Sequence, residues 1–113
     1  MSHPNAIDYI EFTTTDLNGS KAFFQEVFGY EFKDFGPEYA SFKDAAMRGG
    51  FAQGDKAASG GPLVVFYAPD LDSVVAKVKA AGGTIVKETY EFPGGKRFHF
   101  SEPGGNELAV WSE

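Results

Sequence analysis

Residues 7–17 of the chain read IDYIEFTTTDL, and residues 63–71 read LVVFYAPDL. The Asp-Leu pair that closes the first stretch, Asp16-Leu17, recurs as Asp70-Leu71 at an offset of 70 − 16 = 54. The same offset aligns further residues on both sides of the pair, which indicates an internal repeat. The aligned residues are Ile10 with Val64, Phe12 with Phe66, Phe24 with Val78, Gly29 with Gly83, Phe32 with Val86 and Lys33 with Lys87.

Each copy of the repeat begins with an extended run and continues into a helix. Runs 7–14 and 63–67 are rich in β-formers, and each leads to an Asp that can accept hydrogen bonds from the free N–H groups of a helix start. In the second copy apolar residues recur at three and four positions up to Gly82-Gly83, which predicts a helix with a glycine stop. In the first copy Asn18-Gly19 weakens the opening turn, so that helix is expected to start late.

Three short extended runs follow each helix, separated by Gly- and Pro-containing turns. They span 30–35, 38–43 and 50–53 in the first copy, and 84–90, 96–101 and 107–112 in the second. Residues 54–61 are rich in Gly, Ala and Ser without periodicity and are predicted to be a linker. The sequence therefore predicts one α+β domain over 1–113, with a βαβββ module at 6–53 and a second at 62–112.

Composition narrows the function classes. The chain has 113 residues and a formal charge of −6, and this length is enough for a core without a disulfide. It has no cysteine, which excludes a thiolate nucleophile and a cysteine-ligated zinc ion. The acidic balance argues against nucleic acid and anionic membranes as partners, because both require a basic surface. No apolar run reaches the 18 or more residues of a membrane span, and the expected location is the cytoplasm.

Three segments give the chain a family resemblance: 7–12 followed by Asp16-Leu17, AFFQEVFG at 22–29, and SEPGGNEL at 101–108. With the duplicated βαβββ unit, they resemble the vicinal-oxygen-chelate superfamily of glyoxalase I, extradiol dioxygenases, fosfomycin-resistance enzymes and bleomycin-resistance proteins. The resemblance covers nearly the whole chain. It implies eight strands in two open half-barrels around a cavity, and association into a homodimer.

In metal enzymes of that superfamily up to four inward side chains, usually His, Glu or Gln, chelate a divalent ion. The resemblance maps these positions to Tyr9, Phe51, Leu63 and Ala109, none of which is a preferred ligand. We therefore expect no metal cofactor at the family positions. A displaced metal site would draw on Glu11, His99 and Glu107, the metal-competent side chains that strand alternation turns inward.

The same alternation predicts a cavity wall that suits a small organic molecule. The predicted ligand-binding residues are Tyr9, Tyr39, Ser41, Phe51, Leu63, Tyr67, Arg97 and Trp111. His99 is the candidate general base, with Glu11 as a second proton acceptor. Three alternatives stay open: a neighbouring group satisfies the hydrogen bonds of His99, Glu11 pairs with Arg97, or Arg97 clamps a substrate carboxylate.

These observations favour a small-molecule-binding protein with a degenerate metal site, and sequestration of a small aromatic or cationic compound is one concrete form. The alternative is a family enzyme, a glyoxalase-like lyase or isomerase or a dioxygenase, that uses displaced metal ligands or metal-free acid–base chemistry. A third hypothesis is an accessory module whose cavity its own aromatic side chains fill.

Overall fold

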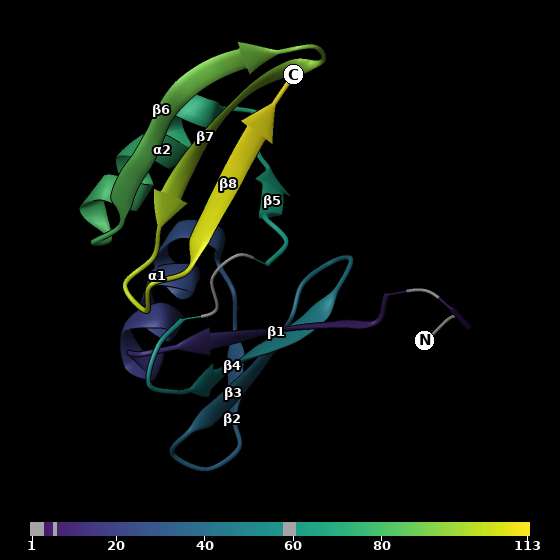
Figure 1. Cartoon of the computed structure of the whole chain (residues 1–113), viewed down its shortest axis with the longest axis vertical. Coiled ribbons are helices and arrows are strands. Elements are labelled where there is room, and N and C mark those ends of the chain that lie inside the picture. The colour runs from purple at the N-terminus through teal and green to yellow at the C-terminus, as the bar shows by residue number, and fades with distance from the viewer. Residues whose placement is uncertain (1–3, 6, 58–60) are drawn as a thin grey trace.

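The computed structural model describes residues 4–5, 7–57 and 61–113, so His3 and part of the predicted linker lie outside the described residues. Two βαβββ modules follow one another along the chain, as predicted (Figure 1). The first contains β1 (Tyr9–Thr14), α1 (Leu17–Phe28), β2 (Phe32–Asp34), β3 (Tyr39–Lys43) and β4 (Arg48–Gln53). The second contains β5 (Val64–Tyr67), α2 (Leu71–Ala80), β6 (Thr84–Phe92), β7 (Gly95–Ser101) and β8 (Glu107–Ser112).

Each module forms its own four-stranded sheet. The strand order is β1-β4-β3-β2 in the first sheet, here called sheet 1, and β5-β8-β7-β6 in the second, sheet 2. In both sheets the first strand pairs in parallel with the last strand of its module, and the remaining pairs are antiparallel. The two sheets are separate, and β1 and β5 are both edge strands.

The start of α1 differs from the sequence-based expectation. The helix begins at Leu17, because the Asp16 carboxylate accepts a hydrogen bond of 2.9 Å from the backbone N–H of Gly19. A Cβ at Gly19 would lie 2.2 Å from Asp16 Oδ2, so the glycine that weakens helix propensity also makes room for the cap. The predicted late start was wrong. The glycine stops are confirmed, since Gly29 and Gly82 have φ of 72° and 93°.

The observed strands match the predicted runs with shifted ends. β8 coincides with its predicted run, β6 continues to Phe92, and β2 is reduced to Phe32–Asp34. β4 begins at Arg48, two residues before the predicted start at Gly50.

One aromatic core lies beneath both helices and joins the two modules. Phe24 of α1 is fully buried, and its ring centroid lies 4.9 Å from that of Phe51 in β4 and 5.9 Å from that of Phe66 in β5. Phe28 stacks on Phe66 with centroids 4.2 Å apart, and Phe23 lies 5.6 Å from Phe100 of β7. Helix α1 therefore packs against both sheets, and its burial stabilises the arrangement of the modules.

A buried polar cluster forms a second link between the modules. The carboxylate of Glu102, in the turn between β7 and β8, is 2% exposed and accepts a hydrogen bond of 2.6 Å from the hydroxyl of Ser20 in α1. Thr14 at the end of β1 bonds to the same Ser20 hydroxyl at 2.8 Å. Thr15 N–H also donates to the carbonyl of Gly104 at 3.1 Å.

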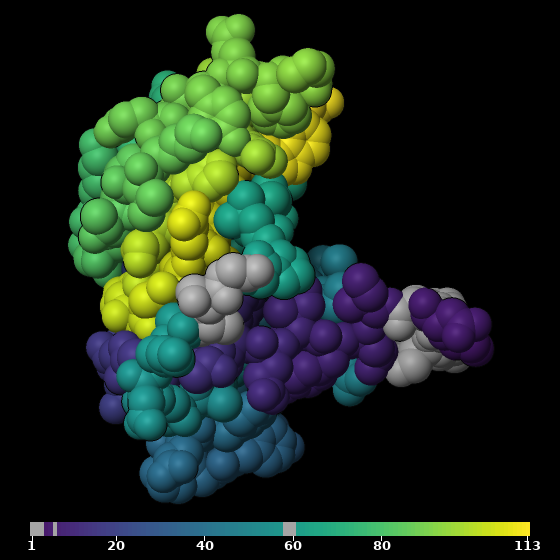
Figure 2. Space-filling model, in the orientation of Figure 1, coloured from purple at the N-terminus to yellow at the C-terminus, as the bar shows by residue number. Residues whose placement is uncertain are grey.

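The space-filling view shows the two modules as lobes that meet on one side of the molecule (Figure 2). None of the helices in the described residues has the length and apolar character needed to cross a membrane.

Replacing Gly104 by alanine is expected to destabilise the fold. A Cβ there would lie 1.6 Å from Thr14 Oγ1 and 2.4 Å from Ser20 Oγ, so it must push apart the hydrogen bonds that join the modules. We expect a loss of about 2 to 4 kcal/mol in the free energy of unfolding, measured by urea denaturation. Gly61→Ala is the control, because nothing lies within 4 Å of a Cβ at that position. Equal midpoints for the two variants would contradict the role of the cluster.

Candidate functional site

The helices cover one face of each sheet and leave the other, here called the open face, to carry the candidate site. Phe12, Phe42 and Phe51 of sheet 1 pack into the core, as do Phe98, Leu108 and Val110 of sheet 2. Side chains alternate along a strand, so their sequence neighbours lie on the open face. These neighbours include Tyr9, Glu11, Tyr39, Ser41, Lys43, Arg48 and Gly50 in sheet 1, and Val65, Tyr67, Arg97, His99, Glu107, Ala109 and Trp111 in sheet 2.

A hydrogen-bonded pair of tyrosines lies on the open face of sheet 1. The Tyr39 hydroxyl donates to Glu11 Oε1 at 3.0 Å, and it lies 2.5 Å from the Tyr9 hydroxyl. Burial, the hydrogen bonds to Tyr9 and Glu11, and the charge of Glu11 raise the pKa of Tyr39 above its ordinary value. Tyr39 therefore remains a neutral donor at physiological pH and holds the Glu11 carboxylate in place.

Gly50 makes this tyrosine pair possible. A Cβ at Gly50 would lie 2.4 Å from the Tyr39 hydroxyl oxygen and 2.6 Å from that of Tyr9. Phe51, predicted to face the cavity, is fully buried and stacks on Phe12 at 5.0 Å. Strand β4 is therefore shifted by one residue from the predicted register, and Gly50 takes the open-face position expected for Phe51.

A chain of four polar groups crosses the open face of sheet 2. His99 Nδ1 lies 3.1 Å from Glu107 Oε2, and His99 Nε2 lies 3.0 Å from the Tyr90 hydroxyl, which also accepts a hydrogen bond from Arg97 Nε. His99 is 8% exposed, whereas the side chain of Glu107 is 52% exposed. The imidazole is thus held from both nitrogens, an arrangement that can orient a ligand or relay a proton.

Aromatic side chains border this polar chain. Tyr67 meets Trp111 edge-on with ring centroids 5.1 Å apart, and Phe92 lies 6.3 Å from Trp111. Tyr67 is 52% exposed, and its hydroxyl donates to Glu113 Oε1 at 2.8 Å. That hydrogen bond, with a smaller contribution from burial, raises the pKa of Tyr67. Exposed rings beside buried polar groups are typical of a binding face.

The structure divides the predicted site residues between the two sheets. Tyr9, Tyr39 and Ser41 lie on sheet 1, whereas Tyr67, Arg97 and Trp111 lie on sheet 2. Leu63 is 36% exposed just before β5. The anticipated pairing of Glu11 with Arg97 does not occur, because Tyr39 holds Glu11 and Tyr90 holds Arg97.

Sequence reasoning missed Tyr90. Its place depends on the pairing of β6 with β7, in which Tyr90 lies opposite Arg97 after two irregularities in the register. The alternating run KETYEF at 87–92 is extended in character, but no sequence signal sets where those irregularities fall.

The side chains at the superfamily's metal positions do not fit a metal ion. Tyr9 offers only a phenol that is already hydrogen-bonded, while Gly50, Leu63 and Ala109 offer no side-chain donor atom. The displaced set is split, since His99 and Glu107 adjoin on sheet 2 while Glu11 lies on sheet 1. In the described part of the chain no three His, Asp or Glu side chains are grouped to hold a metal.

The sequence matches the family model described as the Glyoxalase/Bleomycin resistance protein/Dioxygenase superfamily over residues 6–110. The chain belongs to this superfamily. The match spans both modules and confirms the predicted resemblance. No curated protein matches the chain in sequence.

Solved structures show that the superfamily fold extends over the whole chain. A glyoxalase/bleomycin resistance protein/dioxygenase family enzyme from Burkholderia phytofirmans is 20% identical with a TM-score of 0.81, covering 93% of this chain and 96% of that one. The fosfomycin resistance protein of Listeria monocytogenes is 17% identical with a TM-score of 0.82, covering 98% and 95%. A lactoylglutathione lyase from Agrobacterium tumefaciens is 21% identical with a TM-score of 0.73, covering 98% and 96%. At these identities the superfamily likeness establishes the fold and leaves the chemistry to the site.

Elemental analysis of protein purified without chelator tests the metal prediction for this superfamily member. We expect iron, manganese, nickel and zinc all well below one equivalent per chain, because the donor set at the family positions lacks imidazole and carboxylate groups. The expected content is unchanged in a His99→Gln variant. About one equivalent in the parent protein, lost in that variant, would instead show a metal site that uses His99.

Proposed function

We propose that this protein binds a small aromatic organic molecule on the open face of sheet 2, as a binding protein rather than a metalloenzyme. The observation that carries the proposal is a pair of rings, the exposed Tyr67 and the partly buried Trp111, beside the hydrogen-bonded chain from Glu107 to Arg97. Flat rings supply contact area at low entropic cost, and the polar chain supplies orientation. The ligand stacks on the rings and presents its polar group to Glu107 or the His99–Tyr90 pair.

A positive charge on the ligand fits this face. The Tyr90 ring already holds two cations, with Lys87 Nζ at 4.6 Å and Arg97 Cζ at 5.5 Å from its centroid. Arg97 also lies 5.6 Å from the Phe92 centroid. Trp111, whose indole gives the strongest cation–π attraction, has no such partner among the residues that the structure describes, and the half-exposed Glu107 adds a negative charge. A cationic aromatic compound would therefore give the Trp111 ring the cation–π contact that Tyr90 already has.

An enzymatic role is the second candidate, and the His99 contacts favour it. Glu107 at 3.1 Å from Nδ1 can fix the imidazole tautomer, which leaves Nε2 to exchange a proton with Tyr90 at 3.0 Å. This is an acid–base relay that needs no metal. Glu11, the other predicted catalytic residue, would have to come from a second copy of the chain to join it.

A homodimer is the proposed working form. The two sheets of one chain are not joined by strand pairing, and the edge strands β1 and β5 each lack a neighbour on one side. Exposed apolar side chains lie on or beside these edges: Ile7 at 77%, Tyr9 at 39%, Leu63 at 36% and Val65 at 40% exposure. A second copy would cover them, as the resemblance to the superfamily implies.

Light scattering coupled to size exclusion tests the dimer. We expect twice the 12.2 kDa mass of the chain at micromolar concentration. Val65→Lys places a charge on the edge strand and is expected to shift the population to monomer, whereas Val86→Lys, on the 52% exposed Val86 of β6, is the control. A parent protein that remains monomeric would contradict the proposal.

Fluorescence of Trp111, the one tryptophan of the chain, reports directly on the proposed site. The probes are benzamidine and the neutral benzamide, which have the same shape and differ in charge. We expect benzamidine to change the emission with an affinity about tenfold higher than that of benzamide, because the indole face and Glu107 both attract a cation.

Glu107→Gln is expected to reduce this preference for benzamidine, and Glu88→Gln on the outer strand β6 serves as the charge-matched control. Tyr67→Ala should weaken both probes alike, since it removes a stacking surface rather than a charge. Equal affinities for the two probes in the parent protein would refute the cationic class. An unchanged emission with either probe would refute the site.

A further inference from the structure

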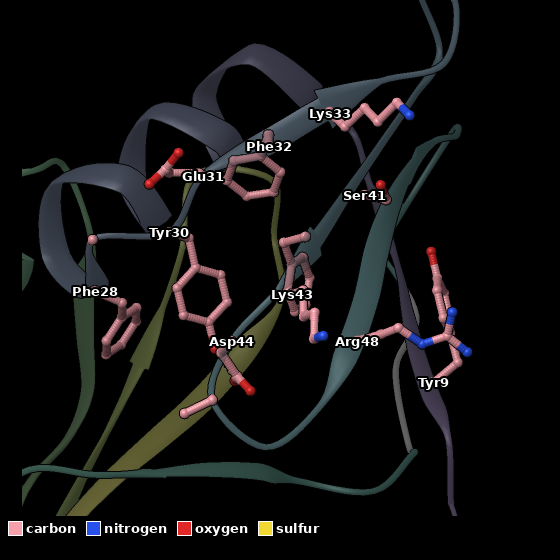
Figure 3. A pocket seen from close by; sticks show the side chains of 13 residues that line it. Tyr9, Phe28, Tyr30, Glu31, Phe32, Lys33, Ser41, Lys43, Asp44 and Arg48 are labelled. Atoms are coloured by element: carbon pink, nitrogen blue, oxygen red, sulfur yellow. Dashed lines mark hydrogen bonds between the residues drawn. The ribbon is translucent and has the colours of Figure 1, made fainter. Parts of the chain in front are cut away.

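A second feature, independent of the proposed site, is a cavity of about 730 Å³ on sheet 1 (Figure 3). Strands β2 and β3 are paired only from Phe32 opposite Phe42 onward. The cavity opens beyond that pair, where the residues before β2 and those after β3 separate. One wall consists of aromatic rings: Phe28, Tyr30, Phe32 and Phe42. The Tyr30 and Phe42 centroids are 4.8 Å apart, so this wall is a continuous apolar surface.

The opposite wall is basic. Lys33, Lys43 and Arg48 line the cavity together with the Ser41 hydroxyl and Tyr9. The whole chain has 10 basic and 16 acidic side chains, yet the cavity lining contains three basic and only two acidic ones. The cavity thus has the opposite charge balance to the chain that surrounds it.

The two acidic residues of the lining do not neutralise the lysines. Asp44 accepts hydrogen bonds from the Tyr30 hydroxyl at 2.6 Å and from the N–H groups of Ala46 and Met47 at 2.8 Å and 2.6 Å. Burial opposes ionisation of Asp44, but these three donors hold its pKa below the ordinary value. Figure 3 shows Glu31 turned toward α1, on the other side of the cavity from Arg48 and Tyr9.

The basic residues are also placed against one another. Lys43 of β3 lies directly opposite Arg48 of β4, and like charges in that position destabilise a strand pair. Arg48 pairs with Asp8 and lies over the Tyr9 ring at 5.9 Å. Neither Lys33 nor Lys43 forms an ion pair with any residue that the structure describes. Lys33 lies opposite Ser41, and its ammonium nitrogen lies over the Phe35 ring, 5.2 Å from the centroid.

We propose that this cavity binds an aromatic carboxylate. The carboxylate lies against the Lys43 ammonium group and accepts a hydrogen bond from the Ser41 hydroxyl, while Lys33 and Arg48 supply further positive charge. The aromatic body packs against the rings of Phe28 and Tyr30. Binding of the anion relieves the repulsion between Lys43 and Arg48, because Lys43 has no ion-pair partner in the described part of the chain.

The test compares benzoate, benzamide and benzamidine, three planar probes that differ in charge, by amide chemical-shift titration of the full chain. We expect benzoate to shift resonances of residues 41–48 and to bind there at least about tenfold more tightly than benzamide or benzamidine. Benzoate affinity is expected to fall as ionic strength rises, because the attracting charges are exposed. Benzamidine is expected to shift resonances of β7 and β8 instead, which belong to the separate site proposed on sheet 2.

A Lys33→Met, Lys43→Met double variant keeps the side-chain length and is expected to lose at least about tenfold in benzoate affinity. Lys77→Met, Lys79→Met on the exposed end of α2 makes the same change in net charge and is expected to bind benzoate as the parent does. Equal benzoate affinity in the two double variants, equal binding of benzamide and benzoate, or no benzoate shifts at residues 41–48 would each overturn the proposal. None of these results depends on the ligand site of sheet 2.

Discussion

The fold depends on one buried carboxylate. Glu102 accepts four hydrogen bonds, from the Ser20 hydroxyl at 2.6 Å, the Gly104 N–H at 2.8 Å, and the backbone and side-chain N–H groups of Asn106 at 3.1 Å and 2.7 Å. Three of these shape the turn that leads into β8, and the fourth ties that turn to α1 of the other module. A buried acidic group without such donors would cost several kcal/mol, so its donors must be in place when the modules meet. The cluster therefore sets where β8, and with it Glu107 and Trp111, lies relative to sheet 1.

The aromatic core extends this constraint across the molecule. Helix α1 supplies Phe24 and Phe28 to a set of rings that includes Phe66 of the second module, so each sheet buries its apolar face partly against an element of the other. Most of the twelve phenylalanines and Tyr30 are used in this way, which leaves the other four tyrosines and the tryptophan for the open faces. Residues with a polar group on an aromatic ring can remain half-exposed and still accept a ligand, because water solvates the polar end.

The repeat predicted the element order and the fold, because local signals such as the Asp caps and glycine stops decide both. It failed for Phe51, since the copies differ in length after their helices. Glu11 lies beside Gly50 and Val65 lies beside Ala109, so the last strands are offset by 109 − 50 = 59, whereas the first strands are offset by 65 − 11 = 54. The longer β6–β7 hairpin accounts for most of this change, since the third strands are offset by 99 − 41 = 58, and the turn before β8 adds the last residue. Tyr90 could not be placed for the same reason, because irregularities in strand pairing set its register. Which residues become hydrogen-bond partners across a sheet depends on the strand register, and a single sequence does not specify that register.

Net charge proves a poor guide to the charge of a binding face. The value of −6 favours a cationic ligand when the chain is treated as a single object, and the site proposed on sheet 2 relies on a single acidic group, Glu107, for the same preference. The cavity on sheet 1 has an excess of positive charge, because β2, β3 and β4 each contribute a basic side chain to its lining. Interactions between exposed charges fall off over about 8 to 10 Å at physiological salt, so each face acts on a ligand through its own few groups. Since α1 and the Glu102 cluster hold the two sheets as separate faces, one small acidic chain has room for the two proposed sites, which differ in the charge of the ligand each is expected to prefer.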